Sequence, residues 1–291
     1  MKTKSDTDLF VKSLLENSDR LEKKMNDIMK WKYYQPQMQE VMRKLNKGTK
    51  FILSKTKDFK KSIGDEFMWD KKKYLGLGIN LMTPIIKETL LNQGTEAMLT
   101  VKPDVVYSLL DEARKYLNKT PKKISKTVTE TAYDRIRKSL ADGIEAGESV
   151  SQLKDRVIEG YKSLEVYQAE TIARTEVSRA TNFATIDAFK QSGVVEGKEW
   201  VVTPDDRLCE FCEAMESEYN AKAGLDDNYF NKGDSVTGID GGIMNIEFDD
   251  ISGPPLHPNC RCVLKSVEKL VEKKQKEDEL FDIISKEIDG I

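Results

Sequence analysis

The stretch CEFC at residues 209–212, followed by HPNCRC at residues 257–262, decides the organisation of this chain. These two clusters contain all four cysteines and the single histidine of the 291 residues. Cysteines that only fill a core would be scattered, whereas a CxxC pair presents two thiolates to one tetrahedral ion, and a second cluster can complete the shell. The pattern predicts a structural zinc site with these ligands: Cys209, Cys212 and Cys260, with His257 or Cys262 as the fourth.

Other interpretations of the cysteines remain open. Four cysteines can form disulfides in an oxidising compartment, or they can be plain buried thiols. The first residues, MKTKSD, lack the apolar segment of a secretory signal, so we expect folding in a reducing cytoplasm, which favours metal over disulfides. The histidine and the long intervening loop favour zinc over an iron–sulfur cluster.

The rest of the chain has the composition of long helices. Charged residues make up 33% and hydrophobic residues 38% of the sequence. The sequence contains no apolar run of about 18 residues, so no membrane span is predicted. Apolar residues recur at helical spacing from residue 8 to 32 and in later segments. We expect Pro103 to open a helix, Pro121 to break it and Gly160 and Gly193 to end later helices. The fold class is mainly α, with a small α+β zinc-binding module near the C-terminus.

Three regions are predicted along the chain. Residues 1–100 form a helical, partly basic N-terminal region, residues 101–265 a second domain, and residues 266–291 a C-terminal helix. The second domain ends in a metal module, residues 198–265. In this module a strand at residues 198–203 leads into the first cysteine cluster, and residues 219–253, rich in Asp, Asn and Gly, form a long loop or a small hairpin.

Charge is distributed unevenly although the net charge is only −3. Residues 1–100 contain 20 Lys and Arg against 13 Asp and Glu, whereas residues 201–262 contain 4 against 13. The basic region suits phosphates or an acidic protein surface, and the acidic module is poorly suited to nucleic acid. Solvated surface lysines are the simpler interpretation of the basic region.

A helix expected at residues 165–191 carries a stripe of small residues that permits close approach of another element. Glu176 lies in this stripe, and a carboxylate on a packed face needs a partner. We expect the segment from Ala173 to Glu176 to contact the metal module, with Arg174 and Glu176 reaching loop backbone or a charge such as Arg207.

Several of these stretches resemble one known family. They are ARTE at residues 173–176, the strand with Trp200, DRxCxxC at residues 206–212 and PPLHPNCRC at residues 254–262. The phage head morphogenesis family, typified by the F protein of phage Mu, has similar motifs over about residues 100–265. The resemblance implies a minor head protein of a tailed bacteriophage, present in the virion near the portal inside the head and in the host cytoplasm during assembly. Its implied partners are the portal protein, the scaffold or major capsid protein, and packaged DNA bound without sequence specificity.

Catalysis is not expected. A catalytic zinc keeps an open position and a nearby base, whereas four cysteines and one histidine can close the shell. The candidate bases Asp205, Asp206 and Glu210 fit loop and turn positions, and no nucleophile–histidine pair or glycine-rich phosphate loop is present. The alternative function is a cytosolic zinc-dependent protein that binds or hydrolyses nucleic acid.

Overall fold

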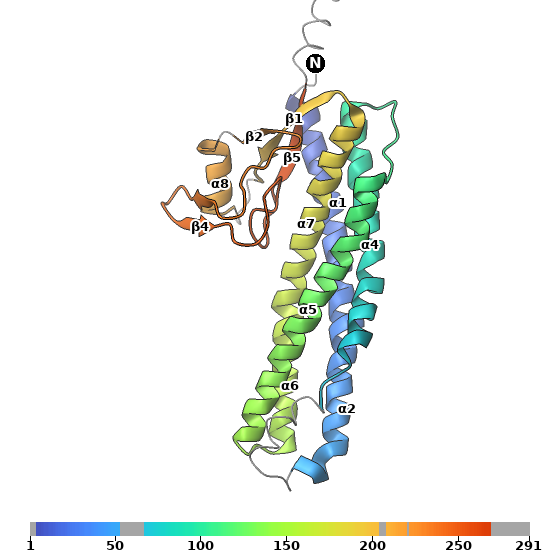
Figure 1. The fold of residues 1–291 in the computed structure, drawn as a ribbon, viewed down its shortest axis with the longest axis vertical. Coiled ribbons are helices and arrows are strands. Elements are labelled where there is room, and N and C mark those ends of the chain that lie inside the picture. The colour runs from blue at the N-terminus through green and yellow to red at the C-terminus, as the bar shows by residue number, and fades with distance from the viewer. Residues whose placement is uncertain (1–3, 53–66, 204–207, 220, 269–291) are drawn as a thin grey trace, which may run out of the picture. The chain divides into compact units, whose positions relative to one another are not determined.

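The computed structural model describes residues 4–52, 67–203, 208–219 and 221–268 (Figure 1). The chain divides into two compact units. The helical unit comprises Asp19–Glu88 and Leu110–Val177, and the mixed unit comprises Met1–Ser18, Thr89–Leu109 and Ser178–Ile291. Both units include segments from the first hundred residues, and residue 100 lies within the Thr89–Leu109 segment of the mixed unit. The three predicted regions stay a prediction.

Most described residues are helical, so the predicted fold class is confirmed. The helices, two of them π-helical turns, are α1 (Lys4–Asp27), η1 (Ile28–Tyr34), α2 (Gln35–Ile52), α4 (Lys71–Val101), α5 (Asp111–Glu145), α6 (Val150–Ser163), η2 (Leu164–Gln168), α7 (Ala169–Ser192) and the short α8 (Glu210–Ser217). None of the helices in the described residues is both long and apolar enough to cross a membrane.

Buried aromatic rings fill the centre of the helical unit. Tyr34 meets Tyr161 edge-on with ring centres 6.5 Å apart, and Trp69 lies 5.9 Å from Tyr161 and 6.1 Å from Tyr74. The Tyr33 hydroxyl shares a 2.5 Å hydrogen bond with the Thr129 hydroxyl of α5. Edge-to-face pairs add stabilisation beyond that of the apolar area they bury, so these contacts tie η1, α4, α5 and α6 together.

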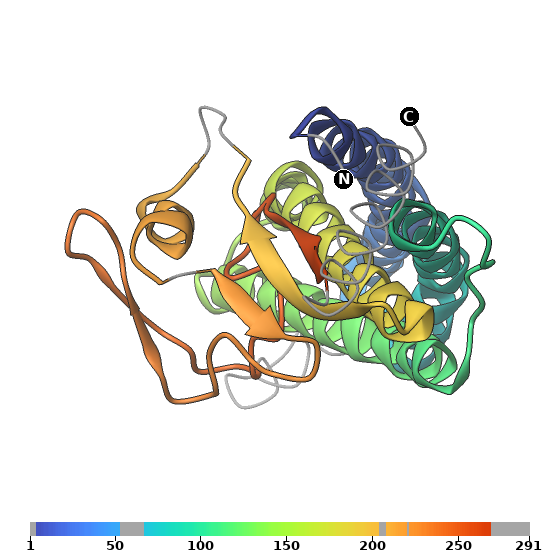
Figure 2. The ribbon, with the colours of Figure 1, turned by 90° about the horizontal axis from the view of Figure 1, so that it is seen from above.

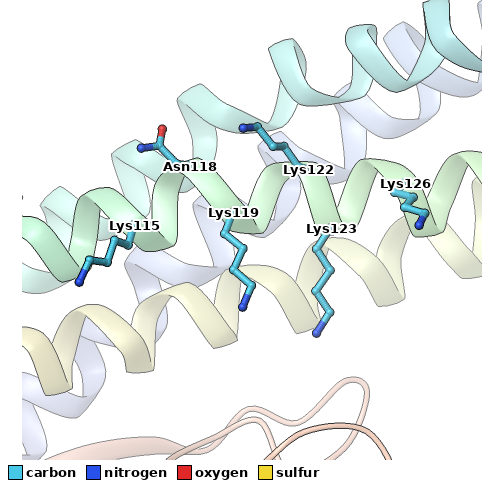
Figure 3. A pocket seen from close by; sticks show the side chains of 6 residues that line it. All are labelled: Lys115, Asn118, Lys119, Lys122, Lys123 and Lys126. Carbon is cyan, nitrogen blue, oxygen red and sulfur yellow. The ribbon is translucent and has the colours of Figure 1, made fainter.

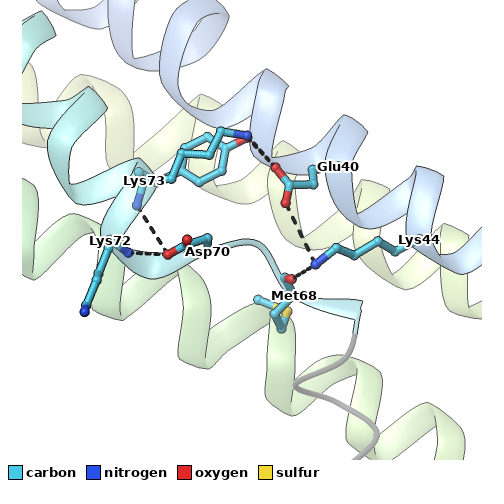
Figure 4. A network of polar contacts seen from close by, with 7 residues as sticks. Glu40, Lys44, Met68, Asp70, Lys72 and Lys73 are labelled. Carbon is cyan, nitrogen blue, oxygen red and sulfur yellow. Dashed lines mark hydrogen bonds and ion pairs between the residues drawn. The ribbon is translucent and has the colours of Figure 1, made fainter.

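A polar network holds the start of α4 (Figure 4). The Asp70 carboxylate accepts the backbone N–H groups of Lys72 at 2.8 Å and Lys73 at 3.3 Å, which caps the helix. Glu40 of α2 accepts from the Lys73 ammonium at 2.8 Å, and Lys44 donates to the Met68 carbonyl. These contacts link α2 to the segment that enters α4.

Two helix boundaries predicted from local sequence are confirmed. The Ser149 side chain and Gln152 form the predicted capping box at the start of α6. α7 ends at Ser192, directly before Gly193, whose φ of 69° is in the left-handed region.

Three predicted helix boundaries are wrong. Pro121 lies inside α5, where the buried apolar face offsets the one backbone hydrogen bond that proline removes. No helix starts at Pro103, because the Tyr107 hydroxyl donates to Asp187 at 2.8 Å and holds the segment before α5 irregular. The helix also continues through Gly160, whose missing side chain lets α6 approach Ile136 of α5.

The mixed unit contains two small sheets. Strand β1 (Val195–Val201) pairs antiparallel with β2 (Lys222–Gly224) on one side and with β5 (Val263–Glu268) on the other (Figure 1 and Figure 2). Strands β3 (Ser235–Thr237) and β4 (Ile243–Asn245) form the hairpin that the sequence left as one option. Residues 266–268 belong to β5, so the predicted terminal helix does not begin there; its remaining residues lie outside the described part of the chain.

Lys198 fixes β1 to the loop after β2. Its side chain is fully buried, and its ammonium group donates to the carbonyls of Leu225 at 3.0 Å and Asp227 at 2.7 Å. Burial lowers the pKa of Lys198 to about 8. A buried ammonium is tolerated because both carbonyls solvate it in place of water.

Candidate metal centre

The first cysteine cluster lies at the start of α8. Cys209 is the N-cap residue, with extended backbone, and its sulfur accepts the backbone N–H of Cys212 at 3.4 Å. One helical turn therefore separates the two thiols of the CxxC motif and turns both toward the same point. The CxxC spacing in the sequence is what makes this local geometry possible.

The second cluster is a tight turn. The backbone N–H of Cys260 donates to the His257 carbonyl at 3.2 Å, and Asn259 adopts a left-handed φ of 66°, a conformation that asparagine tolerates better than most residues. His257 Nδ1 lies 2.7 Å from the Pro258 carbonyl oxygen, to which it donates. This hydrogen bond keeps a proton on Nδ1, so Nε2 is the nitrogen that would bind a metal ion after losing its own proton.

The five predicted ligand residues lie together. His257 Nε2 is 3.0 Å from the Cys209 sulfur and 3.2 Å from the Cys212 sulfur, and the Cys212 and Cys260 sulfurs are 3.6 Å apart. The donor atoms form two overlapping groups, each within 4.8 Å: Cys209, Cys212 and His257; Cys212, Cys260 and Cys262.

These separations fit one tetrahedral ion. Zinc–sulfur bonds of about 2.3 Å and zinc–nitrogen bonds of about 2.0 Å place tetrahedral ligand atoms roughly 3.5–3.8 Å apart. The Cys212–Cys260 distance is within this range, and the two distances to His257 are a few tenths of an ångström shorter. The donor chemistry, thiolates with one imidazole, is that of structural zinc sites.

Proton affinities in the cluster are strongly altered. The hydrogen bond with Cys212, aided by His257, lowers the pKa of the Cys209 thiol to about 4 against the opposing effect of burial. Burial by itself lowers the pKa of His257, but its contacts with Cys209 and Cys260 outweigh burial and raise that pKa to about 9. A thiolate beside an imidazolium is the consequence, and a bound metal ion would replace the remaining protons.

Surrounding elements hold the second cluster in place. Asn182 of α7 donates through Nδ2 to the Cys262 carbonyl at 3.2 Å, and the Thr203 hydroxyl donates to the Arg261 carbonyl at 2.8 Å. Both residues are absent from the sequence-based prediction. Asn182 had no usable signal, because it lies outside the small-residue stripe of this helix and its partner, Cys262, is 80 residues away in the sequence.

Other residues that the sequence predicted to be near the metal module do not appear among the described residues of the cluster. Asp205, Asp206 and Arg207 lie outside the described residues. Arg174 forms ion pairs with Glu22 at 3.4 Å and Glu170 at 2.9 Å, both in the helical unit. The contact of Arg174 and Glu176 with the metal module stays a prediction.

Glu210 is packed against a glycine turn. Its carboxylate lies so close to Gly238 and Gly242 that a β-carbon at either glycine would approach a carboxylate oxygen to 2.4 or 2.8 Å. The Glu210 carbonyl also accepts the Ile239 N–H at 3.4 Å. Glu210 therefore joins α8 to the β3–β4 hairpin, and it is the first residue of this helix rather than the loop or turn residue that the sequence predicted.

The fold and the site together define a class: a mainly helical protein with a small sheet module built around a cysteine–histidine cluster. Residues 134–265 match the model of the family described as Phage Mu protein F like protein, which confirms the resemblance for this segment. The match covers 132 of the 291 residues, so over this segment the chain is similar to the phage Mu F-like family. Neither a curated protein nor a solved structure gives a match to the chain.

Proposed function

We propose that the chain is a minor head protein of a tailed bacteriophage that lies inside the head near the portal. It acts in head assembly and in DNA packaging or delivery, and it does no catalysis. The observation that carries this proposal is the family match over residues 134–265, which begins in α5 and ends in β5. Its proposed partners are the portal protein, the scaffold or major capsid protein, and packaged DNA.

The metal in this proposal is structural zinc. Cys209, Cys212, Cys260 and His257 would hold the ion, and Cys262 lies beside them as the alternative fourth ligand. A bound zinc ion would cross-link α8 to the turn before β5. The hydrogen bond of His257 to Pro258 supports His257 as the ligand, because a ligating imidazole usually donates its other N–H to a carbonyl or carboxylate.

Mass analysis of purified particles tests the head assignment directly. We expect peptides of this chain in DNA-filled heads at a few copies per head, and also in particles that lack tails. A chain that is missing from purified particles, while abundant in the infected cytoplasm, would contradict the proposal and favour the cytosolic alternative.

Portal association needs a separate experiment with the full chain, because truncation at residue 100 would cut through both compact units. We expect purified portal to capture the chain, and we expect this complex to persist between about 50 and 200 mM salt. Binding to DNA through phosphates should weaken steeply over the same range. Failure of portal to capture a metal-loaded chain would remove the portal from the proposal but leave the head assignment standing.

A further inference from the structure

One helix carries a face of exposed lysines that the family match and the metal cluster leave unexplained. This face, called here the lysine face, lies on α5 and consists of Lys115, Lys119, Lys122, Lys123 and Lys126. Together with Asn118 these residues line a shallow open pocket, and Figure 3 shows their side chains extending from the one helix. At about 100° per residue they occupy one side of α5, spread over roughly 17 Å of its length.

Acidic residues are missing from this part of the helix. The sequence from Ala113 to Thr129 contains no Asp or Glu, although both occur just before and after it. Lys115 pairs with Glu112 at 2.7 Å, and both side chains are largely exposed, so solvent screens this pair. Within the described ranges, no ion pair or hydrogen bond involves the side chains of Lys119, Lys122 and Lys126. The face therefore presents at least three cations that the rest of the described structure does not neutralise.

The composition of the face selects the class of partner. Every exposed side chain from Arg114 to Thr127 is polar or basic. A protein interface is centred on aromatic or apolar anchors and is depleted in lysine, so an acidic protein is a poor fit. Single-stranded nucleic acid binds through aromatic side chains that stack on bases, and the exposed part of this face has none.

Duplex nucleic acid needs only what the face provides. Its backbone carries one negative charge per about 1.7 Å of axis, so a length of 17 Å presents about ten phosphates. Lysine ammonium groups on flexible stems follow such a row without fixed geometry and without reading sequence. A single phosphate ion would instead need donors that converge on one point, whereas these lysines are spread along several helical turns.

We propose that the lysine face of α5 binds the sugar-phosphate backbone of double-stranded nucleic acid without sequence specificity. The proposal rests on the head function proposed above, and it specifies one surface for the DNA contact. It differs from the contact through residues 1–100 that the charge distribution suggested. The surface lies wholly within the helical unit, between Leu110 and Val177.

The test compares two triple variants of the full, metal-loaded chain. The first is Lys119→Gln, Lys122→Gln and Lys126→Gln. The matched control is Lys87→Gln, Lys138→Gln and Lys162→Gln, which removes the same charge from exposed lysines of α4, α5 and α6. Binding to a labelled 30-base-pair duplex of arbitrary sequence is measured from about 50 to 200 mM salt. A single-stranded oligonucleotide, a polyglutamate chain and anionic phosphatidylserine vesicles serve as competing probes.

We expect the lysine-face variant to bind the duplex at least tenfold more weakly at about 50 mM salt. The slope of log K against log salt should fall by about 2–3, since each lost phosphate contact removes about 0.9 from it. The control should change affinity less than about threefold. A variant with Lys→Arg at the same three positions should keep wild-type affinity, which would show that positive charge at these positions is sufficient for binding.

Four outcomes overturn the proposal. They are equal effects of the two triple variants, no duplex binding by the wild-type chain, tighter binding to the single strand, and tighter binding to polyglutamate or vesicles than to the duplex. If the triple variant melts at a lower temperature than the wild type, the single variant Lys122→Gln replaces it in the test. The slope of log K against log salt should then fall by about 0.9. These outcomes do not depend on whether the chain is found in purified particles. Duplex binding by the lysine face can therefore be disproved while the head assignment stands, and the head assignment can be disproved while duplex binding stands.

Discussion

The helical unit and the metal module use different means to hold a fold together. In the helical unit, helices of 14 to 35 residues such as α6 and α5 bury interlocking tyrosine and tryptophan rings. In the metal module, strands β2, β3 and β4 have three residues each. Its small buried core includes Trp200, Phe230 and Leu256, and three of the four cysteines lie within that core.

This difference indicates where each region is vulnerable. Long helices gain stability from repeated packing along their length, so the loss of one contact is spread over the unit. Strands of three residues are too short to be stable without cross-links or a large covering core. We therefore expect the cysteine–histidine cluster to determine whether the module folds, and aromatic packing to determine the stability of the helical unit.

Removal of the metal should have the largest effect. Structural zinc sites contribute about 10–16 kcal/mol of apparent binding free energy at neutral pH, so chelation or Cys212→Ser should unfold the module. Amide hydrogen exchange should rise across residues 198–265 and remain slow in α5 and α6. Glu213→Gln, at an exposed position of the same short helix, serves as the control and should bind stoichiometric metal. Purified chain without stoichiometric metal, or with a Cys209–Cys212 disulfide, contradicts the prediction.

The fourth ligand can be identified by comparing two substitutions. His257 Nε2 contacts two of the cysteine sulfurs, so His257→Gln should weaken zinc binding more than 100-fold. Cys262→Ser should weaken it about 10–100-fold, the range typical of residues next to a ligand shell. Competition with a chromophoric chelator gives both affinities. The opposite order would assign Cys262 as the ligand.

Truncation of a central ring should damage the helical unit and spare the module. Tyr161 is fully buried against Tyr34 and Trp69, so Tyr161→Ala should cost about 3–5 kcal/mol of unfolding free energy. Tyr167→Ala, in the adjacent turn η2, is the control, because this ring is 72% exposed and its loss should change stability by less than about 0.5 kcal/mol. Metal stoichiometry should be unchanged in both variants. A parallel loss of metal would show that the two regions unfold together.

Two glycines of α4 should respond in opposite directions. A β-carbon at Gly94 would lie 2.2–2.5 Å from the Tyr107 ring, so Gly94→Ala should destabilise by about 1–3 kcal/mol. Nothing lies within 4 Å of a β-carbon at Gly76, so Gly76→Ala should stabilise by about 0.5–1 kcal/mol through helix propensity. Chemical denaturation measures both changes. A stabilising Gly94→Ala would mean that Tyr107 is free to move.

The smallest expected effect is a pH dependence in the helical unit. Hydrogen bonds from Lys24 at 2.5 Å and from Arg20 at 2.9 Å hold the pKa of Glu88 below its ordinary value. A carboxyl group with a lowered pKa contributes stability above its unfolded pKa of about 4.5, and this contribution is lost as the pH falls through the folded value. Because the pair is partly exposed, Glu88→Gln should remove less than about 1 kcal/mol at pH 7 and nothing at pH 2. An equal loss at both pH values would indicate a packing effect.

The sequence by itself determined which residues can form a cluster and where several elements end. The CxxC motif, the capping box at Ser149 and the stop at Gly193 depend on contacts within a few residues, and these appear in the structure as expected. The mainly helical class followed from apolar spacing in the same way. The role of the five clustered side chains as metal ligands stays a prediction.

Only the tertiary structure decided the features that depend on distant partners. α5 continues through Pro121 because its apolar face is buried, and the segment at Tyr107 avoids a helix because the hydroxyl reaches Asp187, 80 residues away. Lys198 is buried because two loop carbonyls take the place of water around its charge, and Asn182 supports the second cluster through the carbonyl of Cys262. Local sequence limits which contacts a residue can make, but packing across the chain selects among them, since burial and hydrogen-bond satisfaction depend on the whole fold.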